Sequence, residues 1–169
     1  CGVIHHMNSP SQGLSSLVNV LEEDGFIKLG LYSNLAREDI IKARNIISSN
    51  DIPCSDEGIR SFRKDIISGK FPEIKTLHHW SDFYTVSMCR DLCFHIQEHR
   101  YSVEEIRILL DSHQLSFLGF ILEHSIKDKY SKSYKSDVNQ IVLKNWNEFE
   151  KANPNTFRSM YQFWVRRDK

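Results

Sequence analysis

The fold is decided by residues 1–33, which read CGVIHHMNSPSQGLSSLVNVLEEDGFIKLGLYS. The first four residues have the composition of the end of a buried strand, and they lead directly into His5 and His6. Residues 26–32 form a second short apolar run, typical of a strand that is covered on both faces. With a helix between them, the two strands predict a right-handed crossover unit, the building block of an α/β fold.

The helix between these strands is predicted from its own start and stop signals. Ser9 is suited to the N-cap, and Pro10 follows at the first helical position. Gly25 is suited to end the connection before the second strand. An amphipathic stripe with helical spacing runs through Leu14, Leu17, Val18 and Leu21.

Composition limits the class of protein. The 169 residues are 40% apolar and 26% charged, which is ordinary for a soluble domain with its own core. Lys plus Arg and Asp plus Glu number 22 each, so no net positive field favours nucleic acid or an anionic membrane. The sequence has no apolar run near the ~18 residues that span a bilayer. Four cysteines do not make a disulfide scaffold, so a cytoplasmic location is expected.

The rest of the chain reads as a helical middle followed by a mixed C-terminal part. One partial domain over 1–169 is expected, with a strand-helix-strand core at 1–34, a helical insert at 35–101 and a helix-strand-helix-strand part at 102–169. Ser102 and Glu105 form a capping box that starts a helix. The other expected elements are helices at 35–47, 55–67, 85–95 and 138–151, strands at 115–122 and 160–165, short turns at 71–84, and a solvated loop at 127–135.

Four potential metal ligands occur close together, Cys89, Cys93, His95 and His99. Each like pair is spaced i, i+4 and could share a helix face, and zinc accepts such ligands. Residues 93 and 95, however, point about 200° apart on a continuous helix. Buried thiols that act as small apolar side chains are therefore the favoured interpretation. A small Cys/His zinc-binding protein remains an alternative.

His5 and His6 attract attention because of where they lie. In open α/β sheets, ligands bind in the crevice at the carboxyl ends of the strands. Residues that directly follow the first strand, and Tyr32 and Ser33 after the second, are therefore placed where a ligand would bind.

Three stretches resemble the second half of a class I S-adenosylmethionine-dependent methyltransferase. The first 33 residues resemble its fourth strand, which ends in a His-His stretch, followed by a helix, a glycine-containing leader and the fifth strand. Residues 91–120, DLCFHIQEHRYSVEEIRILLDSHQLSFLGF, resemble the helix that leads into the sixth strand. Residues 149–167, FEKANPNTFRSMYQFWVRR, resemble the closing strand of a bacterial subgroup often fused to tetratricopeptide-type repeats. In that subgroup the last strand is antiparallel and lies beside the fifth.

The resemblance implies a partial Rossmann-like methyltransferase fold with strands four to seven and a helical insert. The family binds its cofactor with a glycine-rich loop after the first strand, and the seven glycines of this chain form no such loop. We therefore expect S-adenosylmethionine to be the cofactor of a complete protein, whose N-terminal half would be the partner of this chain. The chain by itself is not expected to bind the cofactor usefully or to be active.

The resemblance also implies roles for individual residues. Cys1 and Gly2 are expected beside the amino-acid end of the cofactor. His5 and His6 are expected between cofactor and methyl acceptor, with one of them a candidate base because its unperturbed pKa is ~6.5. The acceptor, a protein or a small molecule, is expected to contact Tyr32, Asp91, His95, His99 and Tyr101. A non-catalytic α/β module that binds partners through its helical insert remains the second alternative.

Overall fold

The computed structural model describes residues 2–95, 98–158 and 160–168. The chain divides into two compact units. The sheet unit comprises Cys1–Ala36 and Gln97–Lys169, and the helical unit comprises Arg37–Ile96. Each unit has its own cluster of buried apolar side chains.

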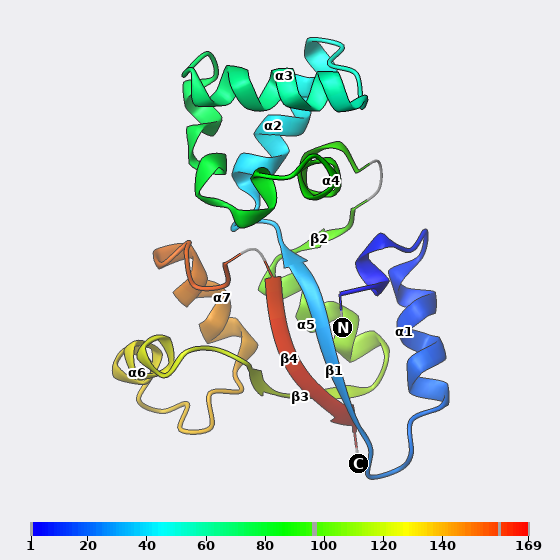
Figure 1. Cartoon of the computed structure of the whole chain (residues 1–169). Helices are drawn as coiled ribbons and strands as arrows, with labels where there is room; N and C mark the ends of the chain where they lie inside the picture. The colour runs from blue at the N-terminus through cyan, green and yellow to red at the C-terminus, as the bar shows by residue number, and fades with distance from the viewer. Residues whose placement is uncertain (1, 96–97, 159, 169) are drawn as a thin grey trace. The chain divides into compact units, whose positions relative to one another are not determined.

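The sheet unit is built on four strands in the order β2-β1-β4-β3 (Figure 1). Its longest pairing joins β1 (Phe26–Ser33) to the antiparallel β4 (Met160–Arg167). β3 (Leu115–Phe120) pairs with the other edge of β4, and the two-residue β2 (Arg100–Tyr101) runs parallel to β1. The closing strand is thus antiparallel and lies beside β1, as the resemblance implied. The short β2 was not predicted.

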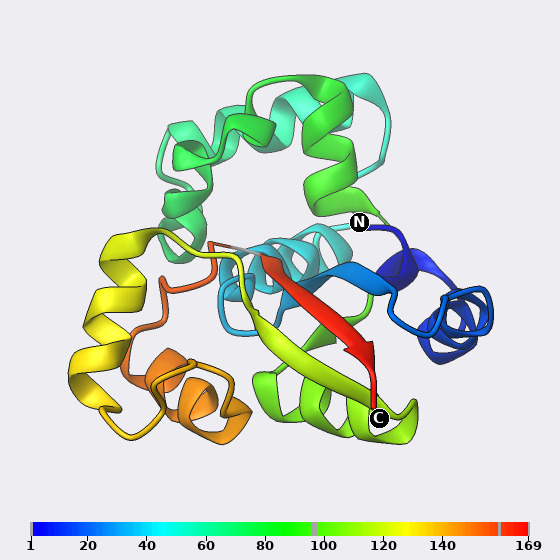
Figure 2. The same ribbon diagram turned by 90° about the horizontal axis from the view of Figure 1, so that it is seen from below.

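One face of this sheet carries the core. Two helices, α5 (Val103–Ser112) and α7 (Leu143–Ala152), lie on the same side of the strands (Figure 2). α5 begins at the predicted capping box of Ser102 and Glu105. Their buried side chains pack against alternate residues of the central strands, among them Leu29, Leu31, Tyr161, Phe163 and Val165.

On the opposite face of the sheet, the end that contains the start of β1 is exposed to solvent. Phe26 and Lys28 of β1 are exposed, and so are Trp164 and Arg166, their neighbours on β4. Phe26 is 59% exposed and Trp164 is 43% exposed. The prediction that residues 26–32 form a strand covered on both faces is therefore wrong for the first half of the strand. The apolar run includes residues that the described part of the chain leaves in solvent.

The predicted opening strand at residues 1–4 is also wrong for the residues that the structure describes. Ile4–His6 forms a 3₁₀ turn, η1, and the backbone of Val3 is already in the helical region. A strand needs a partner to satisfy its backbone groups, and the outer edge of β1 is used differently here. The His5 ring binds the carbonyl oxygen of Gly30 on that edge. In the residues that the structure describes, the predicted strand-helix-strand unit therefore has no first strand.

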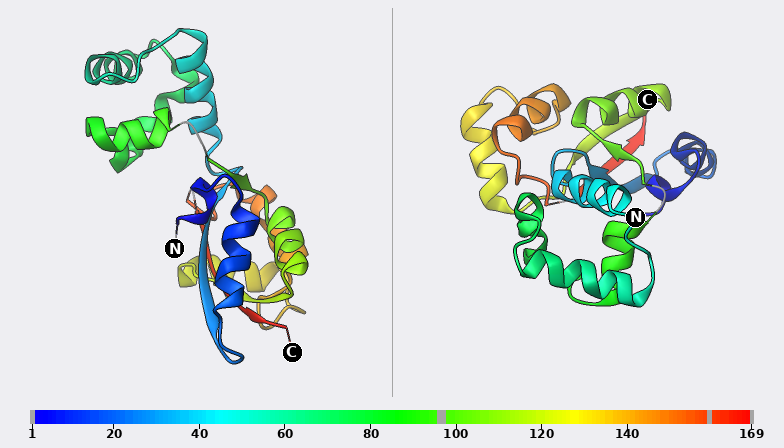
Figure 3. Two further views of the ribbon diagram at one scale, coloured as in Figure 1. Left: turned by 90° about the vertical axis from the view of Figure 1, so that its right-hand side faces the viewer. Right: turned by 90° about the horizontal axis from the view of Figure 1, so that it is seen from above.

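The helix of that unit is present. α1 (Pro10–Asn19) begins with Pro10, and the Ser9 hydroxyl accepts a hydrogen bond from the Gln12 amide at 3.4 Å, as the predicted cap requires. α1 lies beside the outer edge of β1, the edge opposite β4 (Figures 1 and 3).

The predicted loop at 127–135 is instead helix α6 (His124–Ser133). Although the sequence of α6 is polar, Tyr130 is buried and stacks on Trp146 with ring centroids 3.7 Å apart. The Tyr130 hydroxyl donates a hydrogen bond to Asp137. Asp137 also accepts hydrogen bonds from the amides of Ile141 and Val142, at 3.0 and 3.1 Å. This turn delays the start of α7 to Leu143, five residues after the predicted start.

The helical unit contains α2 (Glu38–Ser49), α3 (Asp56–Ile67), the 3₁₀ segments η2 (Pro72–His79) and η3 (Ser81–Phe83), and α4 (Val86–Cys89). The π-helical segment η4 (Arg90–Phe94) follows α4, so the predicted helix at 85–95 changes its winding after Cys89. None of the helices in the described ranges of either unit is both long and apolar enough to cross a membrane.

Replacement of Asp137 by Ala tests the turn before α7. The change removes the acceptor of one hydroxyl and two backbone amides, so we expect a loss of about 3 kcal/mol in the free energy of unfolding. Urea unfolding measures it, with Asp128→Ala on the exposed side of α6 as the control that changes little. A loss below ~1 kcal/mol would show that the turn does not depend on this carboxylate.

Replacement of Gly58 by Ala tests the packing of α3. Helix propensity alone favours Ala by about 1 kcal/mol, but the new Cβ would lie 2.1 Å from the carbonyl oxygen of Pro53. We expect a net loss of roughly 1–3 kcal/mol in denaturant unfolding. Ser61→Ala, on the exposed face of the same helix, is the matched control. A gain in stability for Gly58→Ala would contradict the expected clash.

Candidate functional site

Three aromatic side chains that the sequence singled out meet at the carboxyl end of β1. The ring centroids of His5 and Tyr32 are 3.9 Å apart, and those of His5 and His6 are 4.4 Å apart. His6 meets Tyr32 edge-on at 5.6 Å. We refer to His5, His6 and Tyr32 as the ring cluster. Its members come from η1 and β1, so this turn and this strand end create the cluster together.

The ring cluster is anchored by backbone contacts. His5 is fully buried, and its Nδ1–H donates to the Gly30 carbonyl at 3.1 Å. Because a carbonyl only accepts, Nδ1 is the nitrogen that carries the proton in this contact. The His99 amide donates to the His5 carbonyl at 2.8 Å.

Two further predicted residues lie near the cluster. Tyr101 is opposite Ser33 in the β1–β2 pairing, and burial raises the pKa of its phenol. Gly2 has a φ of +77°, and a Cβ built on it would lie 3.6 Å from Met160 Cε and 3.9 Å from His5 Cε1. Met160 is opposite Tyr32 on β4, so it adjoins the cluster although the sequence did not single it out.

The other predicted site residues are elsewhere or undescribed. Asp91 and His95 belong to the helical unit, and both are exposed. Cys1 lies outside the described residues. The structure therefore brings together His5, His6 and Tyr32, with Gly2, His99 and Tyr101 close by. The roles assigned to all of these residues remain predictions.

The Cys/His quartet is divided between the two units. Cys89 and Cys93 are free thiols in the core of the helical unit, where they pack among apolar side chains. A hydrogen bond from Cys93 lowers the pKa of Cys89, whereas the same contact and burial raise the pKa of Cys93. His99 belongs to the sheet unit. Within residues 2–95, 98–158 and 160–168, no three His, Cys, Asp or Glu side chains form a potential metal site.

Sequence reasoning missed a buried polar network beneath the end of β1. The Ser33 hydroxyl donates to Glu150 Oε1 at 2.8 Å, and the Tyr161 hydroxyl donates to Glu150 Oε2 at 2.7 Å. All three side chains are buried, and burial raises the pKa of Glu150. The sequence does contain an indication that Glu150 is buried, because it follows Trp146 at the i+4 position on the apolar face of α7.

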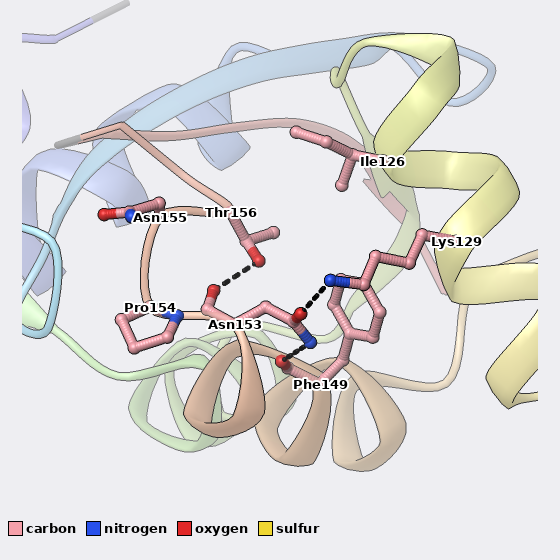
Figure 4. A pocket seen from close by; sticks show the side chains of 7 residues that line it. All are labelled: Ile126, Lys129, Phe149, Asn153, Pro154, Asn155 and Thr156. Carbon is pink, nitrogen blue, oxygen red and sulfur yellow. Dashed lines mark hydrogen bonds between the residues drawn. The ribbon is translucent and has the colours of Figure 1, made fainter.

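The cavities in the described part of the sheet unit include three that no ring of the cluster lines, one of them about 410 Å³ beside Leu110 and Arg166. Another, of about 280 Å³, is lined by residues of α6, α7 and the following loop (Figure 4). Its polar groups are used to end α7, because Lys129 binds the Asn153 side chain and the Asn153 amide donates to the Phe149 carbonyl. Thr156 donates to the Asn153 carbonyl at 2.6 Å. These contacts are typical of the C-terminus of a helix, so the end of α7 accounts for the polar groups in the cavity wall.

The third cavity, about 330 Å³, is a largely apolar groove along the outer edge of β1. On this edge the described residues pair with β1 only at Tyr32 and Ser33, apart from the His5 contact to Gly30. We call this cavity the edge groove. It is lined by Gly2, Val3, Ile4, Met7, Gly13, Ser16, Leu17, Lys28, Leu29 and Gly30.

The residues of this chain do not by themselves fit S-adenosylmethionine. The sequence has no glycine-rich loop, and the rings of the cluster are in mutual contact at 3.9–4.4 Å. None of these three cavities is lined by His6 or Tyr32. Gly2, which has no side chain and lies beside the cluster, leaves room for a close approach by a ligand.

Comparisons with known proteins support the fold. The structure of PKMT2 from Rickettsia typhi, a methyltransferase, matches 98% of this chain with a TM-score of 0.69 and 13% sequence identity. The chain therefore has a methyltransferase-like fold. The uncharacterized protein syc1184_c from Synechococcus sp. (strain ATCC 27144 / PCC 6301 / SAUG 1402/1) is 25% identical over 130 residues, which is 70% of the chain. No protein-family model matches the sequence.

The chain spans about a third of the length of these similar proteins. It covers 34% of the PKMT2 chain and 30% of the Synechococcus protein.

Glu150 gives a prediction about pH. Its folded pKa is raised above the ordinary 4.5, so between these two values the native state binds more protons than the unfolded state. Its contribution to stability is therefore present below pH 4.5 and is lost as the pH rises through the raised pKa. In Glu150→Gln this loss is absent, so the variant should gain stability relative to the wild type as pH rises.

Urea unfolding between pH 4 and 8 measures the difference between the two proteins. Glu148→Gln, an exposed residue of the same helix, controls for the removal of a charge. If the free energy of unfolding of Glu150→Gln instead fell relative to that of the wild type as the pH rose, the pKa of Glu150 would be lowered and not raised.

Proposed function

We propose that this chain is the C-terminal portion of an S-adenosylmethionine-dependent methyltransferase and that it forms the acceptor side of the active site. The observation that carries the proposal is the methyltransferase-like fold shared with PKMT2 over 98% of the chain. The ring cluster supports it, because it lies at the carboxyl end of a sheet strand, where α/β proteins bind ligands.

The chemistry of the ring cluster suits an acceptor site. Methyl transfer is a displacement at a methyl group, in which the protein chiefly positions the nucleophile and excludes water. Tyr32 and His6 are half-buried and offer ring surfaces for positioning. His6 is the better candidate to accept a proton from the acceptor, because His5 is fully buried and bound to Gly30. S-adenosylmethionine would supply the methyl group and would be bound largely by residues outside this chain.

The partner in this proposal is the remainder of the same domain. Two features of the sheet unit support such a partner, namely the edge groove beside β1 and the exposed apolar residues of the open sheet face, Phe26 and Trp164. Sheets of α/β proteins normally have layers on both faces. A protein side chain is the proposed methyl acceptor, and a small molecule is the alternative.

A non-catalytic interaction module is the second candidate function. It is favoured by the same open face, where aromatic and basic side chains lie together in solvent. The two candidates differ in their need for the cofactor, so cofactor binding separates them.

Calorimetric titration of the full-length polypeptide with S-adenosylhomocysteine is the decisive experiment. We expect binding of one equivalent, and full-length protein that shows no binding would contradict the methyltransferase proposal. Transfer of labelled methyl groups from S-adenosylmethionine to extract proteins then tests the ring cluster.

We expect His6→Ala to lower the rate of transfer by about 100-fold. His124→Ala, an exposed histidine at the start of α6, is the matched control. Equal rates for the His6 and His124 variants would remove His6 from the site.

A further inference from the structure

The buried network of Ser33, Glu150 and Tyr161 joins three elements where β1 ends. Ser33 is the last residue of β1, Glu150 belongs to α7, and Tyr161 is near the start of β4. Both oxygens of Glu150 accept hydroxyl hydrogen bonds, at 2.8 and 2.7 Å. The carboxyl group of Glu150 therefore joins Ser33 to Tyr161 through one hydrogen bond from each.

Such a carboxylate is a costly way to hold a core together. Glu150 is 3% exposed, and in the described ranges no ion pair joins it to a Lys, Arg or His. Burial of a charge without a cation costs free energy that two hydroxyl donors offset only in part. An apolar side chain of similar size would fill the same space without that cost. The geometry that the carboxylate imposes is therefore its distinctive contribution.

That geometry extends to the ring cluster through the backbone. Successive residues of a strand face opposite sides, so Ser33 faces α7 while Tyr32 faces the rings. The Ser33 hydroxyl also accepts the Ala36 amide at 3.0 Å, which fixes the chain as it leaves β1. On the neighbouring strand, Tyr161 lies next to Met160, the residue opposite Tyr32. Glu150 thus holds the strand positions beside Tyr32 from the far side of the sheet.

We propose that Glu150 is a positioning residue for the ring cluster, which sets Tyr32 against His5 by binding Ser33 and Tyr161 together. The inference rests on the proposed function for its consequence in methyl transfer, but the structural coupling can be measured without any reaction. The network acts on the rings through Tyr32, which precedes Ser33 in β1 and lies opposite Met160 of β4.

The test is an NMR comparison of the side-chain resonances of Tyr32, His5 and His6 in five proteins. These are the wild-type chain, Glu150→Ala, Glu150→Gln and two controls, Leu110→Ala and Glu148→Gln. Leu110 is buried near Leu115 and Arg166, at the opposite end of the sheet from Tyr32. Its truncation leaves a cavity and should lower the urea midpoint of unfolding, so it shows what loss of stability alone does to the ring resonances. Glu148→Gln is the exposed control on α7.

We expect Glu150→Ala to shift the ring resonances of Tyr32, His5 and His6, and Glu150→Gln to restore most of the wild-type positions. The amide of Gln keeps one acceptor and offers a donor to the second hydroxyl oxygen. Leu110→Ala and Glu148→Gln should leave the ring resonances in place. Unchanged rings in Glu150→Ala, or equal shifts in Leu110→Ala, would overturn the proposal.

In the full-length protein, Glu150→Ala should lower kcat for methyl transfer with little change in KM for S-adenosylmethionine, and Gln should restore kcat. A protein that binds no S-adenosylhomocysteine would contradict the proposed function and leave the NMR result standing. A protein that transfers methyl groups with unchanged ring resonances in Glu150→Ala would contradict only the positioning role.

Discussion

The antiparallel pairing of β1 with β4 is the constraint on which the sheet unit depends. It runs without interruption from Phe26 opposite Arg166 to Tyr32 opposite Met160. On one face it places Leu31 and Tyr161 in the core with α5 and α7, and on the other it places Tyr32 beside His5. The same two strands carry two of the three members of the buried Glu150 network. Core, network and ring cluster are therefore consequences of one ladder of backbone hydrogen bonds.

The elements that could be predicted are those with a local cause. Ser9 and Ser102 start α1 and α5 because their side chains satisfy amides a turn away. β4 was expected because residues 160–165 are a run rich in aromatic residues, which is typical of a strand. Three residues of the candidate site, His5, His6 and Tyr32, were expected together because they follow neighbouring apolar runs. For these three residues, the type of side chain and its position in the sequence were sufficient for the prediction.

The elements that could not be predicted depend on distant partners. α6 has a polar sequence, and its anchor Tyr130 is understood only with Trp146 and Asp137 present. η1 replaces the expected strand because a strand requires a neighbour, whereas His5 here binds the edge of β1 with its side chain. Glu150 appears as an ordinary surface acid unless its place on the apolar face of α7 is noticed. In each case the deciding contact joins residues that the local pattern does not relate.

The same β1–β4 ladder has a consequence for the order of events during synthesis. Its two strands lie near opposite ends of the sequence, and the helical unit and three further helices are encoded between them. Long-range strand pairing of this kind raises the contact order and slows folding. On the ribosome β1 emerges early and cannot be paired until β4 has been made. Through that interval the helical unit, whose core is drawn from one continuous stretch, is able to fold first.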